Sequence, residues 1–223
     1  MSKTIYISVE GQDGCGKTTL VTNLKNYFSR NNITFLHTKE FGSELNKFCS
    51  EMRKLALSSE YNTDELAGQF AFAAIATQHQ ERVIKPNIES GEYNVILSDR
   101  GIDSNYCYGP EHVKKEDREN LKKLFDIAYK GAFLPDLTIL LDISPELSAK
   151  RRSQRPQEAF NNQGKDRVEM KGDLFQSKVR KNFLKRAKKN PERIVIVKIT
   201  EETTPDSLLN QVIETLKRKN LIP

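Results

Sequence analysis

A short segment near the N-terminus carries the residue types and the spacing of a polyphosphate-binding loop. Residues 11–18 read G-Q-D-G-C-G-K-T, which fits the pattern G-x-x-x-x-G-K-[ST]. Glycines let the backbone approach a polyphosphate, while successive N–H groups and the N-terminus of a following helix present partial positive charge to it. In such a loop Lys17 reaches the β and γ phosphates, and the Thr18 hydroxyl binds Mg²⁺. The segment therefore predicts a nucleotide site with Mg²⁺ as cofactor, although a plain glycine turn is the alternative interpretation.

The segments around this loop must position it, and their hydrophobic patterns indicate alternating strands and helices. Five short runs rich in Ile, Val and Leu are typical of buried parallel strands: 4–9, 33–37, 93–98, 137–142 and 193–198. Longer stretches with helical spacing lie between and after them: 18–30, 64–90, 114–130, 145–154, 173–189 and 205–218. Because parallel strands need crossover helices, this order predicts an α/β fold, a five-stranded parallel sheet with helices on both faces.

Length and composition exclude several classes of protein. A chain of 223 residues predicts a single domain, 1–223, that needs no disulfide or metal for stability. The longest apolar run, residues 137–143, falls short of the roughly 20 residues of a membrane helix, so no membrane partner is expected. The N-terminus lacks a signal-peptide pattern. The chain has three cysteines, Cys15, Cys49 and Cys107, and this odd number without metal-ligand spacing fits thiols that are kept reduced. These features predict a cytoplasmic location.

The net charge of +6 is concentrated in one part of the chain. Residues 150–193 carry 15 basic and 5 acidic side chains, a local excess of +10, so the remaining residues sum to −4. Within this basic segment, residues 155–171 have the composition of a long loop, commonly a lid or a disordered stretch. A nucleic-acid-binding module is one interpretation of such charge. Aromatic residues are sparse in the segment, however, so we expect no nucleic acid as a partner.

Four further segments follow the loop in an order that indicates more than nucleotide binding. They are T-K-E-F-G at 38–42, V-I-K-P at 83–86 with S-D-R at 98–100, L-D-I-S-P-E at 141–146, and an arginine-rich stretch that includes D-R-x-E at 166–169. Together with V-E-G-Q-D-G-C-G-K-T-T at 9–19, they resemble the thymidylate kinases in motif order. The resemblance implies the fold of P-loop nucleoside triphosphate hydrolases, with a mobile lid at about residues 151–171. It also implies a homodimer.

The resemblance implies phosphoryl transfer from ATP to a deoxynucleoside 5′-monophosphate, with dTMP as the first candidate for the acceptor. ATP would be bound by Gly11, Gln12, Asp13, Gly14, Cys15, Gly16, Lys17, Thr18 and Thr19. Mg²⁺ would be held by Thr18 and by Asp99, at the end of a strand. The acceptor would contact Asp13, Phe72, Arg100, Ser104 and Tyr108. The alternatives are a salt bridge to Asp99 or Glu10 for Arg100, and a turn-forming role for Asp13.

The resemblance also implies where the catalytic arginine lies. Some thymidylate kinases carry a basic residue inside the phosphate loop, whereas others supply an arginine from the lid. Gly14 and Cys15 occupy the relevant loop positions here, which implies the lid-arginine subtype. The expected catalytic residues are Lys17, Asp13, Arg155 and Arg151, with Arg152 and Arg167 as further candidates for stabilising charge on the transferring phosphoryl. For each of these arginines, the alternative is a solvent-exposed side chain on a helix face with no catalytic role.

The base-recognition segment departs from the family. Thymidylate kinases usually have F-x-x-x-R before V-I-K-P, and here Phe72 stands at the aromatic position but Ala76 at the arginine position. An alanine side chain cannot donate a hydrogen bond to a base. Either Gln78, Gln80 or Arg82 replaces the arginine from a shifted register, or the base is not thymine. Phe41 also stands in place of a proline, and Gly101 in place of a bulky residue.

These departures keep three functions open. The first is a dTMP kinase. The second is a kinase for another monophosphate, such as that of a modified pyrimidine, which Ala76 favours. The third is a nucleotide-binding protein without kinase activity, since Phe41, Ala76 and Gly101 are also compatible with a decayed site.

Overall fold

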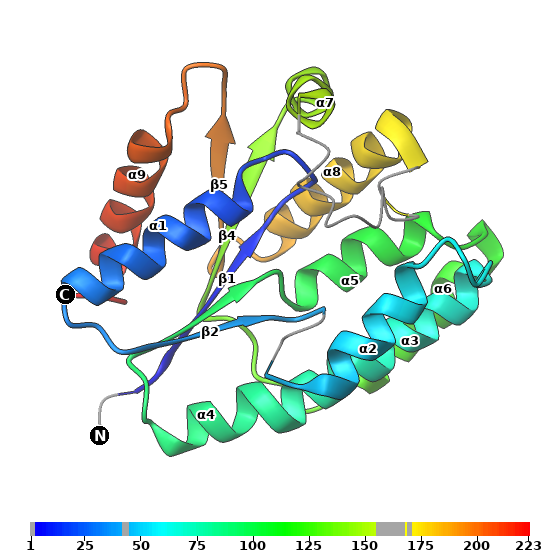
Figure 1. Ribbon diagram of the computed structural model, residues 1–223, viewed down its shortest axis with the longest axis horizontal. Coiled ribbons are helices and arrows are strands. Elements are labelled where there is room, and N and C mark those ends of the chain that lie inside the picture. Colours follow the sequence, from blue (N-terminus) through cyan, green and yellow to red (C-terminus); the bar gives the residue numbers. More distant parts are fainter. Residues whose placement is uncertain (1–2, 42–44, 155–167, 169–170) are drawn as a thin grey trace.

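A five-stranded parallel sheet runs through the centre of the protein in the computed structural model (Figure 1). The structure describes residues 3–41, 45–154, 168 and 171–223. The strands are β1 (Ile5–Glu10), β2 (Phe35–Lys39), β3 (Val95–Asp99), β4 (Leu137–Ile143) and β5 (Ile194–Ile199). Their order in the sheet is β2-β3-β1-β4-β5, and all neighbours are parallel. The predicted α/β fold with five parallel strands is confirmed, with strand ends moved by one or two residues.

Helices connect the strands, and some of them were not predicted. The helices are α1 (Lys17–Arg30), α2 (Lys47–Leu57), α3 (Glu65–His79), α4 (Lys85–Ser90), α5 (Ile102–Tyr108), α6 (Arg118–Ala128), α7 (Pro145–Ser153), α8 (Gly172–Lys189) and α9 (Pro205–Arg218). Short turns of helix are η1 (Gln80–Ile84, of π type), η2 (Gly109–Glu111) and η3 (Lys115–Asp117). The single helix expected over 64–90 is α3, η1 and α4 in direct succession. Helices α2 and α5 were not predicted from the sequence.

Side chains that accept hydrogen bonds from free backbone N–H groups fix where several helices begin. The Asp64 carboxylate accepts from the N–H groups of Leu66 and Ala67 at 2.8 and 3.3 Å, which starts α3. The Ser144 hydroxyl does the same for α7 and is followed by a proline at the first helical position. Thr204 and Ser207 form a reciprocal capping box at α9.

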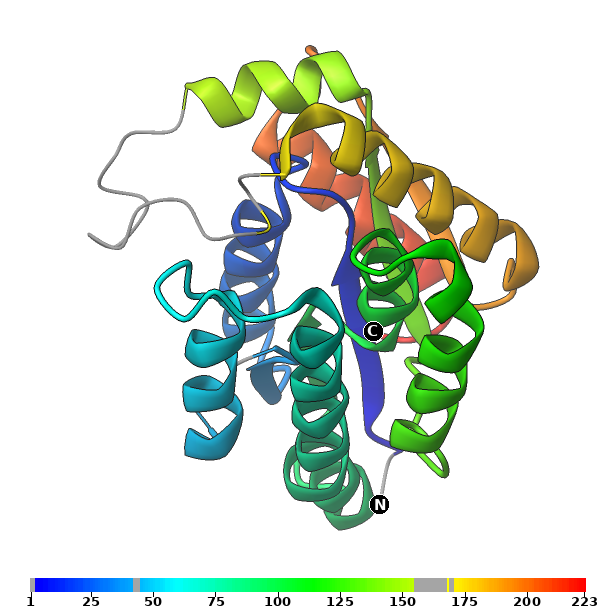
Figure 2. The ribbon, with the colours of Figure 1, turned by 90° about the vertical axis from the view of Figure 1, so that its right-hand side faces the viewer.

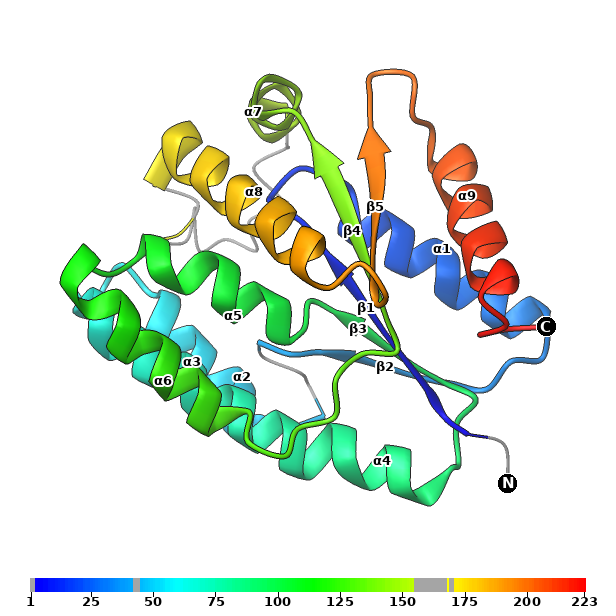
Figure 3. The ribbon, with the colours of Figure 1, turned by 180° about the vertical axis from the view of Figure 1, so that it is seen from behind.

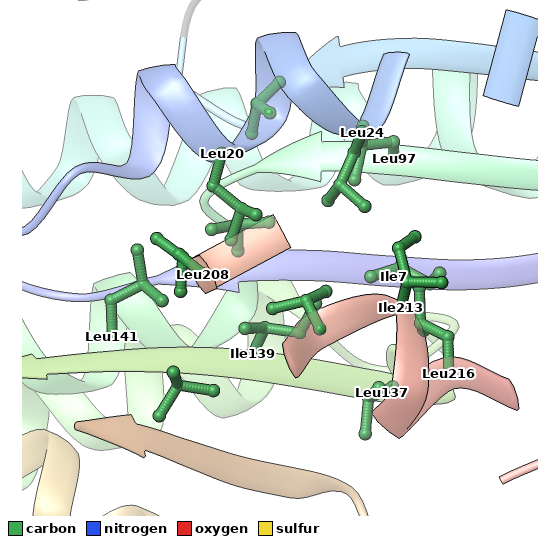
Figure 4. Packing of buried hydrophobic residues seen from close by; sticks show 14 of the residues in the cluster. Ile7, Leu20, Leu24, Leu97, Leu137, Ile139, Leu141, Leu208, Ile213 and Leu216 are labelled. Carbon is green, nitrogen blue, oxygen red and sulfur yellow. The ribbon is translucent and has the colours of Figure 1, made fainter. Parts of the chain in front are cut away.

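One face of the sheet is covered by α1 and α9 (Figure 2). Leu20 and Leu24 of α1 and Leu208 and Leu216 of α9 pack against alternate strand residues such as Ile139 (Figure 4). Every one of these side chains is at most 5% exposed. This packing holds the start of α1, and with it the phosphate-binding loop, against the ends of β1 and β4.

The other face of the sheet is covered by η1, α4, α5 and α8 (Figure 3). Ile96 packs with Ile84 of η1, whereas Leu140 packs with Val179 and Phe183 of α8. Helix α3 lies outside this layer and contacts α2, α5 and α6. Among the described residues, no helix combines the length and apolarity needed to cross a bilayer.

Candidate active site

The loop between β1 and α1 forms one end of a cavity at the carboxyl ends of β1 and β3, the edge of an open α/β sheet where ligands bind. Gly11 adopts φ 142°, and a Cβ there would lie 2.6 Å from the Leu141 carbonyl oxygen, so only glycine fits. Gly16 caps α1 in the left-handed region at φ 101°. The loop geometry is therefore set by its glycines, as the sequence pattern predicts.

The ammonium group of Lys17 lies within the loop. Its Nζ donates to the carbonyl oxygens of Gly11 and Gln12 at 3.0 and 3.1 Å. Gln12 in turn donates through Nε2 to the Ile143 carbonyl at 3.2 Å, which ties the loop to the end of β4. Thr18 is exposed at the first turn of α1 and lines the cavity. The loop thus presents an ammonium, a hydroxyl and a helix N-terminus to the same space, an arrangement suited to a polyphosphate.

Asp13 connects the loop to three other elements. Its Oδ1 accepts from Arg100 Nη2 at 2.8 Å, and its Oδ2 accepts from Gln176 Nε2 of α8 at 3.0 Å. Its carbonyl oxygen accepts from the Ser148 hydroxyl of α7 at 2.7 Å. Arg100 therefore pairs with Asp13 rather than with Asp99 or Glu10, the two partners considered from the sequence.

Arg100 is positioned by its backbone and by the start of α5. Its φ of 70° lies in the left-handed region, which is uncommon for a residue with a side chain and is typical of functional sites. Nη1 lies 3.4 Å from the Ser104 hydroxyl and 3.3 Å from the Tyr108 hydroxyl, and the guanidinium carbon lies 4.9 Å from the Tyr108 ring centroid. Arg100, Ser104 and Tyr108 were all predicted to contact the acceptor, and the structure brings them together.

Glu10 holds the start of α5 from beneath. Its Oε1 accepts from the N–H groups of Gly101 and Ser104 at 2.8 and 3.1 Å, and its Oε2 accepts from the Ser104 hydroxyl at 2.6 Å. Burial, together with the charge of Asp103, raises the pKa of Glu10 to about 7. Because the Ser104 hydroxyl donates its proton to Glu10, the Ser104 oxygen can accept a hydrogen bond from Arg100.

The expected metal ligands face the same cavity. Asp99 and Thr18 both line it, and Asp99 Oδ1 is buried with no hydrogen-bond partner among the residues that the structure describes. Asp99 Oδ2 lies 3.7 Å from Lys39 Nζ. No cluster of three or more His, Cys, Asp or Glu side chains that could hold a metal occurs within the described ranges. A carboxylate and a hydroxyl fit Mg²⁺ that takes its other ligands from phosphates and water.

The arginines assigned to the lid from the sequence fall into three groups. Arg155 and Arg167 lie outside the described residues. Arg151 donates through Nη2 to the Thr200 carbonyl at 3.4 Å, at the end of β5 and away from the loop. Arg152 donates to the Ser148 hydroxyl at 2.6 Å, and its Cγ lies 3.3 Å from where a Cβ on Gly14 would be. Of the two described arginines, it is Arg152 that lies against the phosphate-binding loop.

The far end of the cavity is aromatic and amide-rich. Phe72 of α3 lines it and meets Phe41 edge to face, with ring centroids 5.4 Å apart. Further cavity-lining polar side chains that the sequence analysis did not single out are Lys39, Arg53, Gln69, Asn105 and His112. Gln69 precedes the predicted Phe72 by three residues on the same helical face, a spacing that could have identified it. Ala76 does not line the cavity and is fully buried.

A charged cluster joins α3 to the residue that precedes α8. His112 Nδ1 and Glu65 Oε2 lie 2.8 Å apart, and Lys171 Nζ lies 2.6 Å from Glu65 Oε1. Burial opposes ionisation of Glu65, but its hydrogen bonds with His112 and Lys171 lower the pKa to about 2. Lys171, the last residue of the expected lid, is therefore anchored beside the cavity.

Comparison with known proteins places the chain among relatives of one kind. Residues 9–206 match the family described as thymidylate kinase. A thymidylate kinase of Maridesulfovibrio salexigens is 33% identical over 211 residues, which is 93% of each chain. A thymidylate kinase of a Thermoanaerobacter species is 34% identical over 192 residues, covering 86% of this chain and 88% of that one.

Solved structures show the same fold. The crystal structure of thymidylate kinase from Ehrlichia chaffeensis superposes with a TM-score of 0.70 at 24% identity, covering 97% of this chain and 99% of the other. Thymidylate kinase from Candida albicans superposes with a TM-score of 0.78 at 23% identity, covering 99% and 95%.

Proposed function

The chain belongs to the thymidylate kinase family, and on that premise we propose that it transfers the γ-phosphoryl group of ATP to dTMP, giving ADP and dTDP. The observation that carries the proposal is one cavity with two chemically different ends. The phosphate-binding loop with Lys17 forms one end, and Phe72 forms the other. Arg100 lies between them, where a monophosphate must sit to accept the phosphoryl group.

The residues of the cavity have separate tasks in this reaction. Lys17 and the loop backbone bind the β and γ phosphates of ATP, and the Arg100 guanidinium binds the acceptor phosphate in a two-point contact. Asp13 orients Arg100 through their 2.8 Å ion pair, while Ser104 and Tyr108 fix the other guanidinium nitrogen. The effect is to hold acceptor oxygen and γ-phosphorus close together, which accounts for much of catalysis in phosphoryl transfer.

Charge on the transferring phosphoryl group needs cationic partners besides Lys17. Thr18 and Asp99 would hold Mg²⁺, and the bound ion would neutralise part of the negative charge on the phosphates. A lid arginine supplies the remaining positive charge, with Arg155 and Arg151 as the candidates from the sequence. The position of Arg152 against Gly14 supports Arg152 as a further candidate.

Other expectations from the sequence stay proposals. We propose a single domain, 1–223, located in the cytoplasm and acting on nucleotides rather than nucleic acid. We also propose a homodimer formed through α2 and α3, where Phe48, Leu55 and Phe70 are between 46% and 56% exposed. Burying these side chains against a second copy removes apolar surface from water. Light scattering on the purified protein tests the dimer through its mass.

A coupled assay for ADP formation over a panel of nucleoside monophosphates tests the function. We expect dTMP to give the highest kcat/KM, and Lys17→Ala to abolish turnover while Lys25→Ala, farther along α1, retains it. Turnover with a different monophosphate but not with dTMP would support the kinase of a modified or other pyrimidine. ATP binding without turnover of any monophosphate would support a nucleotide-binding protein without kinase activity.

A further inference from the structure

The position expected to carry a base-reading arginine is packed into the protein. Ala76 has no exposed surface and lies in a cluster with Ile102, Leu121 and Phe125. An arginine side chain would have to enter this apolar contact between α3, α5 and α6, where its charge would be buried. If α3 contributes a hydrogen bond to the base, it must do so from another position.

Gln69 is the polar residue of α3 that lines the acceptor end of the cavity. It lies three residues before Phe72 and seven before Ala76, so all three share one helical face. Gln69 is only 3% exposed, and no described residue forms a recorded hydrogen bond with its side chain. Its amide atoms are not among the fully buried polar atoms without a partner, so what exposure they have is to the cavity that Gln69 lines. A ligand bound in the cavity can therefore hydrogen-bond this carboxamide without displacing a protein partner.

The surrounding backbone leaves room for this carboxamide. A Cβ on Gly109 would lie 3.1 Å from Gln69 Oε1 and 2.7 Å from Phe125 Cε2. Any larger residue at position 109 would push against the ring and the amide together. Glycine in η2 thus makes space for the Gln69 side chain beside the cavity.

A second amide of the cavity wall has a fixed orientation. Asn105 Nδ2 donates to the Tyr129 hydroxyl at 2.8 Å, and that hydroxyl donates to Glu40. The Asn105 side chain therefore keeps its oxygen, an acceptor, for other partners. Gln69 offers both a donor and an acceptor. Thymine presents a carbonyl at C4 and an N–H at N3, which a carboxamide matches in a two-point contact.

We propose that Gln69 hydrogen-bonds the base edge of the acceptor nucleotide, a 4-oxo pyrimidine, in place of the arginine absent at position 76. This inference rests on the proposed function, because it assigns a residue to the acceptor of that reaction. It differs from the replacements considered from the sequence. Gln78, Gln80 and Arg82 do not line the described cavity, and Arg82 is exposed to solvent.

The test is calorimetric binding of dTMP to the full chain and to Gln69→Met, which keeps the length of the side chain but removes its hydrogen bonds. We expect dTMP to bind at least about tenfold more weakly to the variant, because the two-point contact with the base is lost. Binding of 2-deoxyribose 5-phosphate, which has no base, should be the same in both proteins. The matched control Gln78→Met should bind dTMP like the wild type.

Equal affinity of wild type and Gln69→Met for dTMP overturns the inference, as does an equal loss for dTMP and for 2-deoxyribose 5-phosphate. Unchanged ATP affinity verifies that the variant is folded, and Gln69→Leu serves as a second variant if it is not. A wild type that binds dTMP in a Gln69-dependent way but does not phosphorylate it supports the inference while contradicting the proposed function. Absence of dTMP binding to the wild type contradicts both.

Discussion

Asp13 shows how one side chain can serve both nucleotides of the proposed reaction. It sits inside the phosphate-binding loop, yet its carboxylate faces Arg100 and Gln176, and its carbonyl is bound by Ser148. The loop, the acceptor side and the two helices next to the expected lid therefore meet at one residue. A change at Asp13 should reach the acceptor through Arg100 without removing the groups that bind ATP.

Replacing Asp13 with asparagine tests this positioning role. The variant keeps the size of the side chain but removes the charge that holds Arg100, so we expect kcat/KM for the acceptor to fall at least tenfold. KM for ATP should change little. Steady-state kinetics with each substrate varied in turn measures both, and Asp206→Asn on α9 is the surface control. An equal rise of both KM values would argue for a general distortion of the loop instead.

The buried carboxyl groups of Glu40 and Glu10 make the free energy of unfolding depend on pH. Burial raises the pKa of Glu40 to about 8 and that of Glu10 to about 7, from an ordinary 4.5. Between the ordinary and the raised values the folded state holds protons that the unfolded chain has lost, so stability falls as pH rises. Each group contributes on the order of 1 kcal/mol per pH unit over that window, and the decline ends above about pH 8.

Glu40→Gln should flatten this dependence, because the amide does not titrate. Urea unfolding at several pH values between about 5 and 8 measures the slope for the variant and for the wild type. The exposed Glu119→Gln on α6 should leave the slope unchanged. Identical slopes for Glu40→Gln and the wild type would show that Glu40 ionises normally in the folded protein.

At the scale of elements, the sequence predicted best those segments whose structure is determined by their own residues rather than by packing against distant parts of the chain. Buried strands show as short apolar runs, and the phosphate-binding loop needs its glycines at fixed spacing, so both were predicted. Helices α2 and α5 were missed, since α2 has only two fully buried residues and α5 is seven residues long. Asn105 was missed because it joins the cavity only when α5 packs beside α3, whereas the three-residue spacing from Phe72 could have identified Gln69.

The capping box of α9 gives a prediction at this scale. Thr204 and Ser207 satisfy free N–H groups where α9 begins, on the face of the sheet that also carries α1. Thr204→Ala should lower the free energy of unfolding by about 1 kcal/mol without changing turnover. Chemical denaturation and the ADP-formation assay measure the two quantities. Thr22→Ala, inside α1, should be neutral or slightly stabilising because alanine favours helix, and a similar loss in both variants would contradict the capping role.

At the scale of the whole molecule, folding pairs much of the concentrated positive charge of residues 150–193 with carboxylates. Arg186 and Arg193 bind Asp103, Arg180 binds Asp142, and Lys150 binds Glu201. Arg152 and Lys171 also form ion pairs. At least six of the fifteen basic side chains are thus engaged within the fold. The local excess of +10 therefore overstates what the surface offers to an external polyanion.

This pairing predicts no measurable binding to a fluorescently labelled DNA duplex at about 150 mM salt. Fluorescence anisotropy titrations at that and at lower salt measure the affinity. A salt-dependent affinity whose slope reports several phosphate contacts would instead support a nucleic-acid-binding function.

In the proposed reaction, the γ-phosphoryl group of ATP moves to a monophosphate held between Arg100 and Phe72. The most direct test is ³¹P nuclear magnetic resonance of a reaction containing the full chain, ATP, Mg²⁺ and dTMP. We predict that signals of ADP and dTDP appear together in equal amounts, with no inorganic phosphate. Inorganic phosphate formed in step with ADP, or no consumption of ATP, would contradict the account.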